Sequence, residues 1–374
     1  MRLITEGDRF FQEIIRLAET AKKSILIETY IFQDFEFGRK ICDALCKASQ
    51  RGVRVRIIYD SFGSTPNPVL LINSLRESGV IVKRYFPASL VSRKLHPVFR
   101  FLLTPANRIR WYFYSLYRRD HRKIFLVDNK TIVIGGFNLM KEASYISMGE
   151  SRWLDSAIVF KNQNLAVKIR KQFVKTWYDL KKSQIKRLLL RQTKRGEYFS
   201  SLERTPALIS RSAKVQIQRA EQRIWLMFPY FIPPGSWQRL LKKKRKAGVE
   251  ICVFLPVISD SKIIRLISES LAYKLKKKGV RIFFFEKFQN ENTGRFNHSK
   301  LALIDKTVLA GSANLDPRSL FLNLEIMIEF TEKKLVDSLE RQFIKIKQSS
   351  VEPDLKDLRI SWVYYFARPF LFFL

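Results

Sequence analysis

The chain has 374 residues, enough for two domains, and its 46% hydrophobic and 28% charged residues are typical of a globular protein. Lys and Arg number 69 against 34 Asp and Glu, and the formal net charge of +35 predicts a polyanionic partner, either nucleic acid or an anionic membrane surface. The aromatic content of 13% favours the membrane. The three cysteines cannot all pair, and no Cys/His spacing resembles a zinc site.

The N-terminal residues lack the pattern of a signal peptide. Glu6 and Asp8 stand where a signal peptide would need an apolar core, so we expect no signal peptide. Because the sequence contains no run of about 20 apolar residues, we also expect no transmembrane helix.

Helix and strand patterns alternate through the first part of the chain. Apolar residues recur at helical spacing from Phe10 to Ala18, which predicts an amphipathic first helix. Strands are expected at 24–30, 53–59 and 81–85, with helices at 38–50 and 69–77 between them. This β-α-β-α-β order predicts an α/β fold whose sheet contains parallel strands covered by helices.

A basic and aromatic insertion, residues 90–119, interrupts this plan. It contains no acidic residue, and its basic side chains are interleaved with aromatic ones. This pattern predicts an element that lies in the lipid headgroup layer, with a buried insertion helix as the alternative. The residues expected to bind the membrane are Arg108, Arg110, Trp111, Phe113 and Tyr117.

Residues 121–138 carry the first group of candidate functional side chains. The stretch reads as two short strands and a turn, with His121 and Lys123 at alternate positions that face the same side. An imidazole beside a fixed ammonium suits a phosphate substrate. The glycines at 135–136 are expected to let the backbone approach the ligand closely. The candidate residues are His121, Lys123, Asp128 and Asn138.

The second part of the chain repeats the same organisation. Strands are expected at 222–230, 249–255 and 280–285, and helices at 235–246 and 263–277. A second motif follows, in which a histidine again precedes Lys, Asp, Gly and Asn in nearly the same order. Its candidate residues are His298, Lys300, Asp305, Ser312 and Asn314.

This duplication predicts two similar α/β/α sandwich halves, residues 1–199 and 200–374. We expect them to pack about a pseudo-twofold axis, with both histidines in one active-site cleft between them. Residues 181–199 are expected to form a basic linker helix, either solvated or lying on a membrane. The apolar tail, 361–374, either docks in the membrane interface or caps the fold.

The doubled motif resembles the HKD signature of the phospholipase D superfamily. Its flanks are similar to those of bacterial cardiolipin synthases, and the resemblance covers almost the whole chain. It implies the phospholipase D fold for both halves and, without transmembrane helices, the shorter branch of these synthases. The flanks are IETYIF at 27–32, RGVRVRIIYDSFGS at 51–64, Trp153-x-Asp155, FPYFIPP at 228–234 and GSANLDPRSLFLNLE at 311–325.

The resemblance also implies a mechanism without a metal ion or another cofactor. One histidine, His121 by family analogy, attacks the phosphodiester phosphorus, and the other protonates the departing alcohol and later activates the incoming one. Positive charge and amide groups are expected to hold the phosphate oxygens. The residues with this expected role are Lys123, Lys300, Asn138, Asn314 and Ser312.

Four carboxylates accompany the motifs. Asp155 and Glu325, downstream of the motif in each half, are expected to orient the imidazoles. Asp128 and Asp305 belong to the catalytic signature, but each lies an odd number of positions from its histidine. On an uninterrupted strand they would face away, which predicts a role in turn and ion-pair structure.

The sequence therefore favours a cardiolipin synthase-like phosphatidyltransferase that uses phosphatidylglycerol and a second lipid alcohol. A hydrolytic phospholipase D, an HKD nuclease and a non-enzymatic basic membrane protein are the alternatives. We expect the partner to be an anionic membrane containing phosphatidylglycerol and cardiolipin, and we expect no nucleic acid. The expected location is peripheral, on the cytoplasmic face of the cell membrane, and the protein is expected to act as a monomer because both motifs are in one chain.

Overall fold

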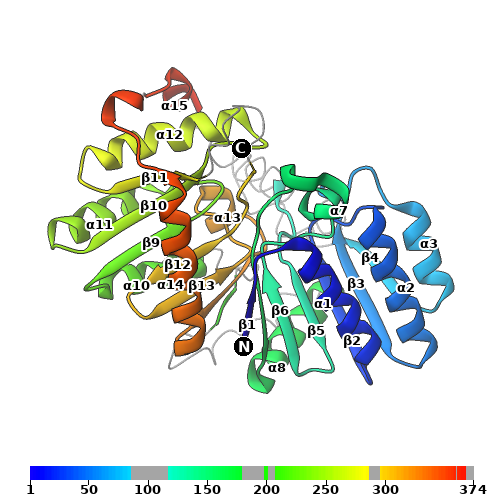
Figure 1. Cartoon of the computed structure of the whole chain (residues 1–374). Coiled ribbons are helices and arrows are strands. Elements are labelled where there is room, and N and C mark those ends of the chain that lie inside the picture. The colour runs from blue at the N-terminus through cyan, green and yellow to red at the C-terminus, as the bar shows by residue number, and fades with distance from the viewer. Residues whose placement is uncertain (86–116, 179–197, 201–206, 286–294, 359, 368–374) are drawn as a thin grey trace, which may run out of the picture.

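Two mixed β-sheets stand next to each other, one built by each part of the chain (Figure 1). The computed structural model describes residues 1–85, 117–178, 198–200, 207–285, 295–358 and 360–367. Within these ranges, no helix combines the length and the apolar character needed to cross a bilayer. The insertion expected to bind the membrane, apart from 117–119, and most of the expected linker helix lie outside the described residues.

The first sheet has seven strands in the order β1-β7-β6-β5-β2-β3-β4. Strands β2, β3 and β4 are parallel, as predicted, whereas β5, β6 and β7 run antiparallel. A tight turn joins β5 directly to β6, and such a hairpin can only be antiparallel. The strands are β1 (Arg2–Ile4), β2 (Ser24–Thr29), β3 (Arg54–Asp60), β4 (Ile81–Tyr85), β5 (Ile124–Val127), β6 (Thr131–Gly135) and β7 (Ala157–Lys161).

Helices cover both faces of this sheet. Alternate residues of β2 point to opposite faces: Ile25 and Ile27 pack against α1, α2 and α3, whereas Leu26 packs on the side of α8. The longer helices are α1 (Gly7–Thr20), α2 (Glu36–Gln50), α3 (Val69–Glu77) and α8 (Gln163–Tyr178), and the short α7 (Tyr145–Met148) precedes β7.

The second sheet has eight strands in the order β15-β11-β10-β9-β12-β13-β14-β8. Its strands β9, β10 and β11 are parallel and precede an antiparallel motif hairpin, β12 and β13, so the plan of the first half is repeated. The strands are β8 (Tyr198–Ser200), β9 (Arg223–Met227), β10 (Glu250–Pro256), β11 (Arg281–Phe285), β12 (Leu301–Ile304), β13 (Thr307–Gly311), β14 (Ile326–Phe330) and β15 (Ser350–Val351).

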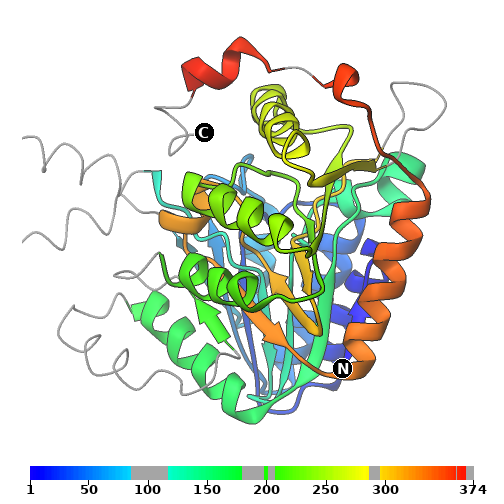
Figure 2. The same cartoon turned by 90° about the vertical axis from the view of Figure 1, so that its left-hand side faces the viewer.

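The chain already enters the second sheet at β8, so the expected boundary at 199/200 falls inside a strand of the second half. The helices of this half are α10 (Ala207–Arg219), α11 (Gly235–Lys246), α12 (Lys262–Lys276), α13 (Pro317–Phe321), α14 (Lys333–Gln348) and α15 (Trp362–Ala367). Figure 2 shows α15 lying over α12, so the described part of the apolar tail caps the fold.

One hydrophobic core lies between the two sheets and is shared by both halves. It combines the inner faces of the sheets with buried residues of α8 and α14. Phe160 of β7 and Phe330 of β14 meet across it, with ring centroids 5.2 Å apart. Burial of this continuous apolar surface holds the halves together and fixes their relative position.

Reciprocal backbone hydrogen bonds add a directional link between the halves. The N–H of His121 donates to the carbonyl of Leu324 (3.0 Å), and the N–H of His298 donates to the carbonyl of Leu154 (2.7 Å). In return, Leu324 donates to Arg119 and Leu154 donates to Phe296. Such an exchange of matching contacts is what a twofold relation between the halves produces.

Asp128 and Asp305 hold the far ends of the motif hairpins. Each follows a motif strand, β5 or β12, whereas the histidine precedes it. Asp128 accepts the backbone N–H groups of residues 22–24 at 2.7–3.0 Å, and Asp305 accepts those of residues 221–223 at 2.8–2.9 Å. These two signature residues are therefore not part of the cleft, and their inclusion among the catalytic residues has to be corrected. The expected turn is present, since both have positive φ, but their partners are backbone amides.

These contacts predict a pH-dependent contribution to stability. Partial burial opposes ionisation, but the backbone donors outweigh it and hold the pKa of both Asp128 and Asp305 below the usual value. We expect Asp128→Asn or Asp305→Asn to lower the free energy of unfolding by about 1–3 kcal/mol at pH 7. A carboxylate with a depressed pKa stabilises the fold above its unfolded pKa, and this contribution is lost as the pH falls.

The measurement is urea unfolding of each variant from pH 7 to pH 3.5. The difference in the free energy of unfolding between each variant and the wild type should become smaller once the pH falls below about 4. Asp43→Asn, at an exposed position on α2, is the matched control. A difference that stays constant over this range would show that the charge of the carboxylate is not what stabilises the turn.

Candidate active site

Four of the functional residues predicted from the sequence line one cleft between the halves. The cleft has a volume of about 300 Å³, and both halves contribute to its walls. His121 and His298 line it, as expected, together with Asn138 and Asn314. A space of this size is at the lower end of the range for small-molecule sites and suits a lipid headgroup better than a whole lipid.

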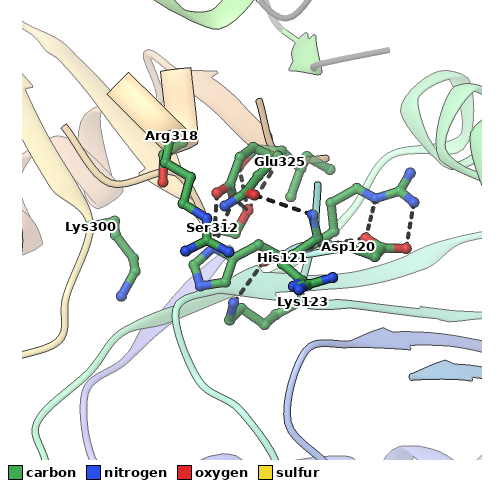
Figure 3. Close-up of polar contacts among 12 residues, drawn as sticks. Asp120, His121, Lys123, Lys300, Ser312, Arg318 and Glu325 are labelled. Atoms are coloured by element: carbon green, nitrogen blue, oxygen red, sulfur yellow. Dashed lines mark hydrogen bonds and ion pairs between the residues drawn. The ribbon is translucent and has the colours of Figure 1, made fainter. Parts of the chain in front are cut away.

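Each histidine is anchored by a carboxylate of the opposite half. His121 Nδ1 lies 2.9 Å from Oε1 of Glu325 and 3.1 Å from its Oε2 (Figure 3). His298 Nδ1 lies 2.7 Å from Oδ2 of Asp155. An Nδ1–H that donates to a carboxylate leaves the lone pair of Nε2 available in a ring that lines the cleft.

Asp155 and Glu325 each contact the histidine of the opposite half, not the histidine that precedes them in their own half. Asp155 directly follows Leu154, which exchanges backbone hydrogen bonds with the strand of His298. Glu325 directly follows Leu324, which does the same with the strand of His121. The reciprocal contacts between the halves therefore place each carboxylate beside the histidine of the other motif.

The two histidine–carboxylate pairs differ in their electrostatics. Burial, followed by the charges of Lys123 and Lys300, lowers the pKa of His121 well below the usual value. Burial raises the pKa of Glu325 to about 8, although the charge of Lys123 opposes this. Burial therefore favours a neutral His121 ring at neutral pH, whose Nδ1–H donates to the Glu325 carboxyl group.

His298 keeps more capacity to hold a proton. Burial and the charge of Lys300 lower its pKa, but the charge and the hydrogen bond of Asp155 raise it. Lys300 Nζ also lies 2.8 Å from His298 Nδ1. This nitrogen can donate to Asp155 or accept from Lys300, but not both at once. We assign the proton to the His298–Asp155 bond because it is shorter and charge-assisted.

The two lysines lie buried beneath the histidines. Lys123 Nζ donates to the backbone carbonyl of His121 at 2.7 Å, and Lys300 Nζ donates to the carbonyl of His298. Burial lowers the pKa of Lys123 to about 7 and that of Lys300 to about 8. An anion in the cleft would favour the charged form of both, so their charge is coupled to the binding of a phosphate.

The two asparagine amides lie at the cleft wall in different surroundings. Asn138 Oδ1 accepts the N–H of Ile31 at 3.1 Å, which leaves its amide N–H groups as donors. Asn314 Oδ1 is buried and has no hydrogen-bond partner among the described residues. Both amides line the cleft, as predicted for groups that bind phosphate oxygens.

Ser312 does not face the phosphate position that the sequence suggested. Its hydroxyl donates to Oε2 of Glu325 at 2.5 Å and accepts the N–H of Ile326 at 3.1 Å, so it holds the carboxylate that anchors His121. The first half has Gly136 at the matching position. A Cβ there would lie 2.0 Å from Oδ1 of Asp155. The glycine therefore makes room for a carboxylate, not for the backbone approach to a ligand that we expected.

A buried ion network supports only the first motif. Arg122 is 1% exposed and donates to both oxygens of Asp120 at 2.8 and 2.7 Å. Glu28 lies 3.3 Å from the same guanidinium, and the N–H of Asp120 donates to Asp60 at 3.0 Å. The second motif has Asn297 and Ser299 at these positions, so this network fixes the strand of His121 but has no counterpart beneath His298.

Sequence reasoning missed the aromatic walls of the site. Tyr30 meets the His121 ring edge-on with centroids 4.9 Å apart, and Trp153 and Phe296 each lie 5.6 Å from the His298 ring. Tyr230 lines the cleft as well. Tyr30, Trp153 and Tyr230 lie within the sequence stretches that carry the family resemblance, which was the signal available for them.

The residues expected to bind a membrane are mostly not described. Arg108, Arg110, Trp111 and Phe113 lie outside the described residues. Tyr117 is 37% exposed.

Within the described parts of the chain, no three His, Cys, Asp or Glu side chains gather in a way that could hold a metal ion.

Comparison with known proteins identifies the family. The family model described as "Cardiolipin synthase, PLD-like domain" matches residues 14–177 and 214–347, well over half of the chain. The chain belongs to this family.

Curated relatives agree with this assignment. Cardiolipin synthase 1 of Bacillus cereus is 29% identical over 367 residues, which cover 94% of this chain and 67% of that protein. Cardiolipin synthase A of Pseudomonas entomophila is 28% identical over 349 residues, which cover 91% of this chain and 67% of that protein. The chain thus spans about two thirds of the length of these relatives.

Solved structures support the fold. Phosphatidylserine synthase of Haemophilus influenzae superposes with a TM-score of 0.69 at 14% identity, covering 99% of this chain and 92% of that chain. Polyphosphate kinase of Porphyromonas gingivalis has a TM-score of 0.60 at 13% identity, covering 98% of this chain and 52% of that chain. At these identities the likeness concerns the fold alone.

The crossed pairing predicts which histidine each carboxylate affects. Because the charge of Asp155 raises the pKa of His298, Asp155→Asn should lower that pKa and leave the titration of His121 unchanged. Glu325→Gln should perturb the resonances of His121 and spare those of His298. NMR titration of histidine-labelled protein, with assignments from His→Ala variants, measures both effects. Perturbations confined to the half that carries the substitution would contradict the crossed pairing.

Proposed function

We propose that the protein is a phosphatidyltransferase of the cardiolipin synthase type. It moves the phosphatidyl group of phosphatidylglycerol to a hydroxyl of a second lipid through a covalent phosphohistidine. The observation that carries this proposal is the pair of histidines in one cleft, each with Nδ1 anchored to a carboxylate and a lysine beneath it. Two imidazoles arranged in this way suit a two-step displacement at phosphorus.

In the first step, Nε2 of one histidine forms a bond to the phosphorus while the bond from phosphorus to the glycerol oxygen breaks. The other histidine gives its proton to that oxygen, and glycerol leaves. In the second step the same histidine takes a proton from the hydroxyl of the acceptor lipid. The acceptor oxygen then bonds to phosphorus, and the phosphorus–nitrogen bond breaks, so both imidazoles return to their initial state.

The electrostatic difference between the two pairs supports His121 as the nucleophile. A nucleophile must be neutral, and burial together with nearby lysines keeps His121 in that form. A general acid must carry a proton, and Asp155 favours the protonated form of His298. Lys123, Lys300 and the two asparagine amides would stabilise the charge on the phosphate oxygens.

This mechanism predicts a strong and non-additive loss of activity. His298→Ala should lower turnover by about 10²–10⁴-fold, since general acid–base catalysis contributes that much. His121→Ala should abolish turnover, and the double variant should be scarcely worse than His121→Ala alone because the two residues act as a unit. The assay is purified protein with phosphatidylglycerol vesicles, with products identified by mass spectrometry.

His96→Ala, which replaces the third histidine of the chain, is the matched control and should behave like the wild type. Formation of phosphatidic acid without cardiolipin would show that the protein is a hydrolase. In this alternative the same residues act with water as the acceptor. If neither product forms at any lipid composition, the proposed function is wrong.

We also propose that the protein binds peripherally to anionic membranes, at the cytoplasmic face, and acts there as a monomer. Besides the net charge of +35, the aromatic helix α15 supports this proposal. Its Tyr364 is buried against Ile264 and Ile232, which both line the cleft. The opposite side of the helix exposes Trp362 (72%) and Phe366 (73%). Exposed aromatic side chains beside a cleft for a lipid headgroup suit the interfacial layer of a bilayer.

The two contributions to membrane binding should respond differently to salt. Each Lys or Arg near an anionic surface contributes about 1 kcal/mol, and salt screens this attraction but not aromatic insertion. We expect high salt to release only part of the wild-type protein from phosphatidylglycerol vesicles and nearly all of a Trp362→Ser/Phe366→Ser variant. Val167→Ser, at an exposed position on α8, is the control. Equal release of wild type and double variant in a sedimentation assay would show that α15 does not contribute to membrane binding.

A further inference from the structure

Two arginines line the cleft without a role in the two-histidine mechanism. Arg119 lies two residues before His121, and Arg318 lies on α13. Both are half-buried. The position two residues before the second motif histidine is held by Phe296, so the first motif has a cation where the second has an aromatic ring.

Both guanidinium groups affect the electrostatics of the cleft next to His121. Burial and the charge of Asp60 raise the pKa of Tyr30 to about 12, while the charges of Arg318 and Arg119 oppose this rise. The charge of Arg318 also contributes to the lowered pKa of His121. Figure 3 shows the Arg318 side chain reaching toward the His121–Glu325 pair. The two arginines thus form one cationic wall, which we call the arginine wall.

The contacts of Arg119 leave donors for a ligand. Arg119 stacks on the Phe62 ring at 4.6 Å, and its buried Nε has no hydrogen-bond partner among the described residues. None of the ion pairs within the described ranges involves Arg119. Arg318 donates through Nη2 to the carbonyl of Tyr117 at 3.2 Å, which fixes part of its guanidinium.

The carboxylates in the cleft wall are engaged elsewhere. Asp260 accepts the hydroxyl of Tyr230 at 2.7 and 2.6 Å. Asp316 caps α13 by accepting the N–H of Ser319 at 2.8 Å, and its pKa is raised by burial although Arg318 opposes this. The cleft therefore offers more positive charge than a single phosphodiester, already served by Lys123 and Lys300, requires.

We propose that the arginine wall is a second anion subsite, which binds the phosphodiester of the acceptor lipid that is not cleaved. Guanidinium groups are suited to phosphate because their planar donors match its oxygens. This inference rests on the proposed phosphatidyl transfer and names the residues that would select its acceptor. The acceptor is an anionic phospholipid with a free hydroxyl, as opposed to water or a neutral alcohol.

The geometry of such an acceptor is compatible with the roles of the histidines. A flexible glycerol unit joins the acceptor phosphodiester to the attacking hydroxyl. The phosphate can therefore lie against the arginine wall while the hydroxyl approaches phosphorus from the side of His298. Water and small alcohols gain nothing from the subsite, so the arginine wall favours transfer to a lipid over hydrolysis.

The test is a competition between acceptors within one reaction. Wild type, Arg119→Gln, Arg318→Gln and the double variant are incubated with phosphatidylglycerol vesicles and ethanol, and the ratio of cardiolipin to phosphatidylethanol is measured. A charge-assisted hydrogen bond contributes about 1.5–3 kcal/mol, so each substitution should lower the ratio by about tenfold or more. Arg318→Lys keeps a cation and should restore part of the ratio. Arg54→Gln, at an exposed start of β3, controls for weaker vesicle binding.

An unchanged ratio overturns the proposal. Equal loss of both products would mean that the arginines act on the scissile phosphate, and no loss of either would mean that they bind no phosphate during the reaction. These outcomes differ from failure of the proposed function, in which the wild type itself would form neither product. The readout is a ratio of products, so a variant that folds less well still reports on the choice of acceptor.

Discussion

The hydrogen bonds that cross between the halves are the constraint on which the site depends. A phosphodiester displacement needs two imidazoles on one cleft, and each half supplies one imidazole together with the carboxylate that anchors the other. The 2.9 Å contact of His121 with Glu325 and the 2.7 Å contact of His298 with Asp155 exist only while the sheets keep their relative position. The shared core between the sheets and the backbone bonds of residues 154 and 324 maintain that position. The catalytic groups are therefore assembled only when the two halves are packed together.

Within this twofold plan the two pairs have diverged. Ser312 holds the longer Glu325 side chain, whereas Gly136 leaves space for the shorter Asp155. The Asp120–Arg122 network and the arginine wall lie beside His121, and the described residues beside His298 contain no counterpart of either. This difference is what two chemical roles require, because a neutral nucleophile and a proton carrier need different surroundings. The duplicated sequence thus supplies the geometry, and the differences between the halves adjust the electrostatics.

Local patterns in the sequence were sufficient for the elements and for the residues of the site, but not for their partners. Helical spacing and β-branched runs depend on near neighbours, so α3 and α11 were predicted with the bounds that the structure has, and α1 and β2 within a few residues. The crossed pairing could not be predicted, because it depends on which strands of the two halves meet. Ser312 was misassigned because its contact with Glu325 depends on the pairing of β13 with β14, which the local sequence does not reveal. Nothing in the sequence distinguished Arg318 from the many other basic residues of the chain.

The central claim is that both motifs form a single active site that works through one covalent intermediate. The most direct measurement is the amount of phosphatidylated histidine per chain, determined by rapid acid-free quenching with labelled phosphatidylglycerol and by mapping of the labelled peptides. We predict that the label saturates at no more than one phosphatidyl group per chain and is found at His121. Two labelled histidines per chain would mean that the motifs act as separate sites. A chain that turns over lipid without any labelled histidine would contradict the covalent mechanism.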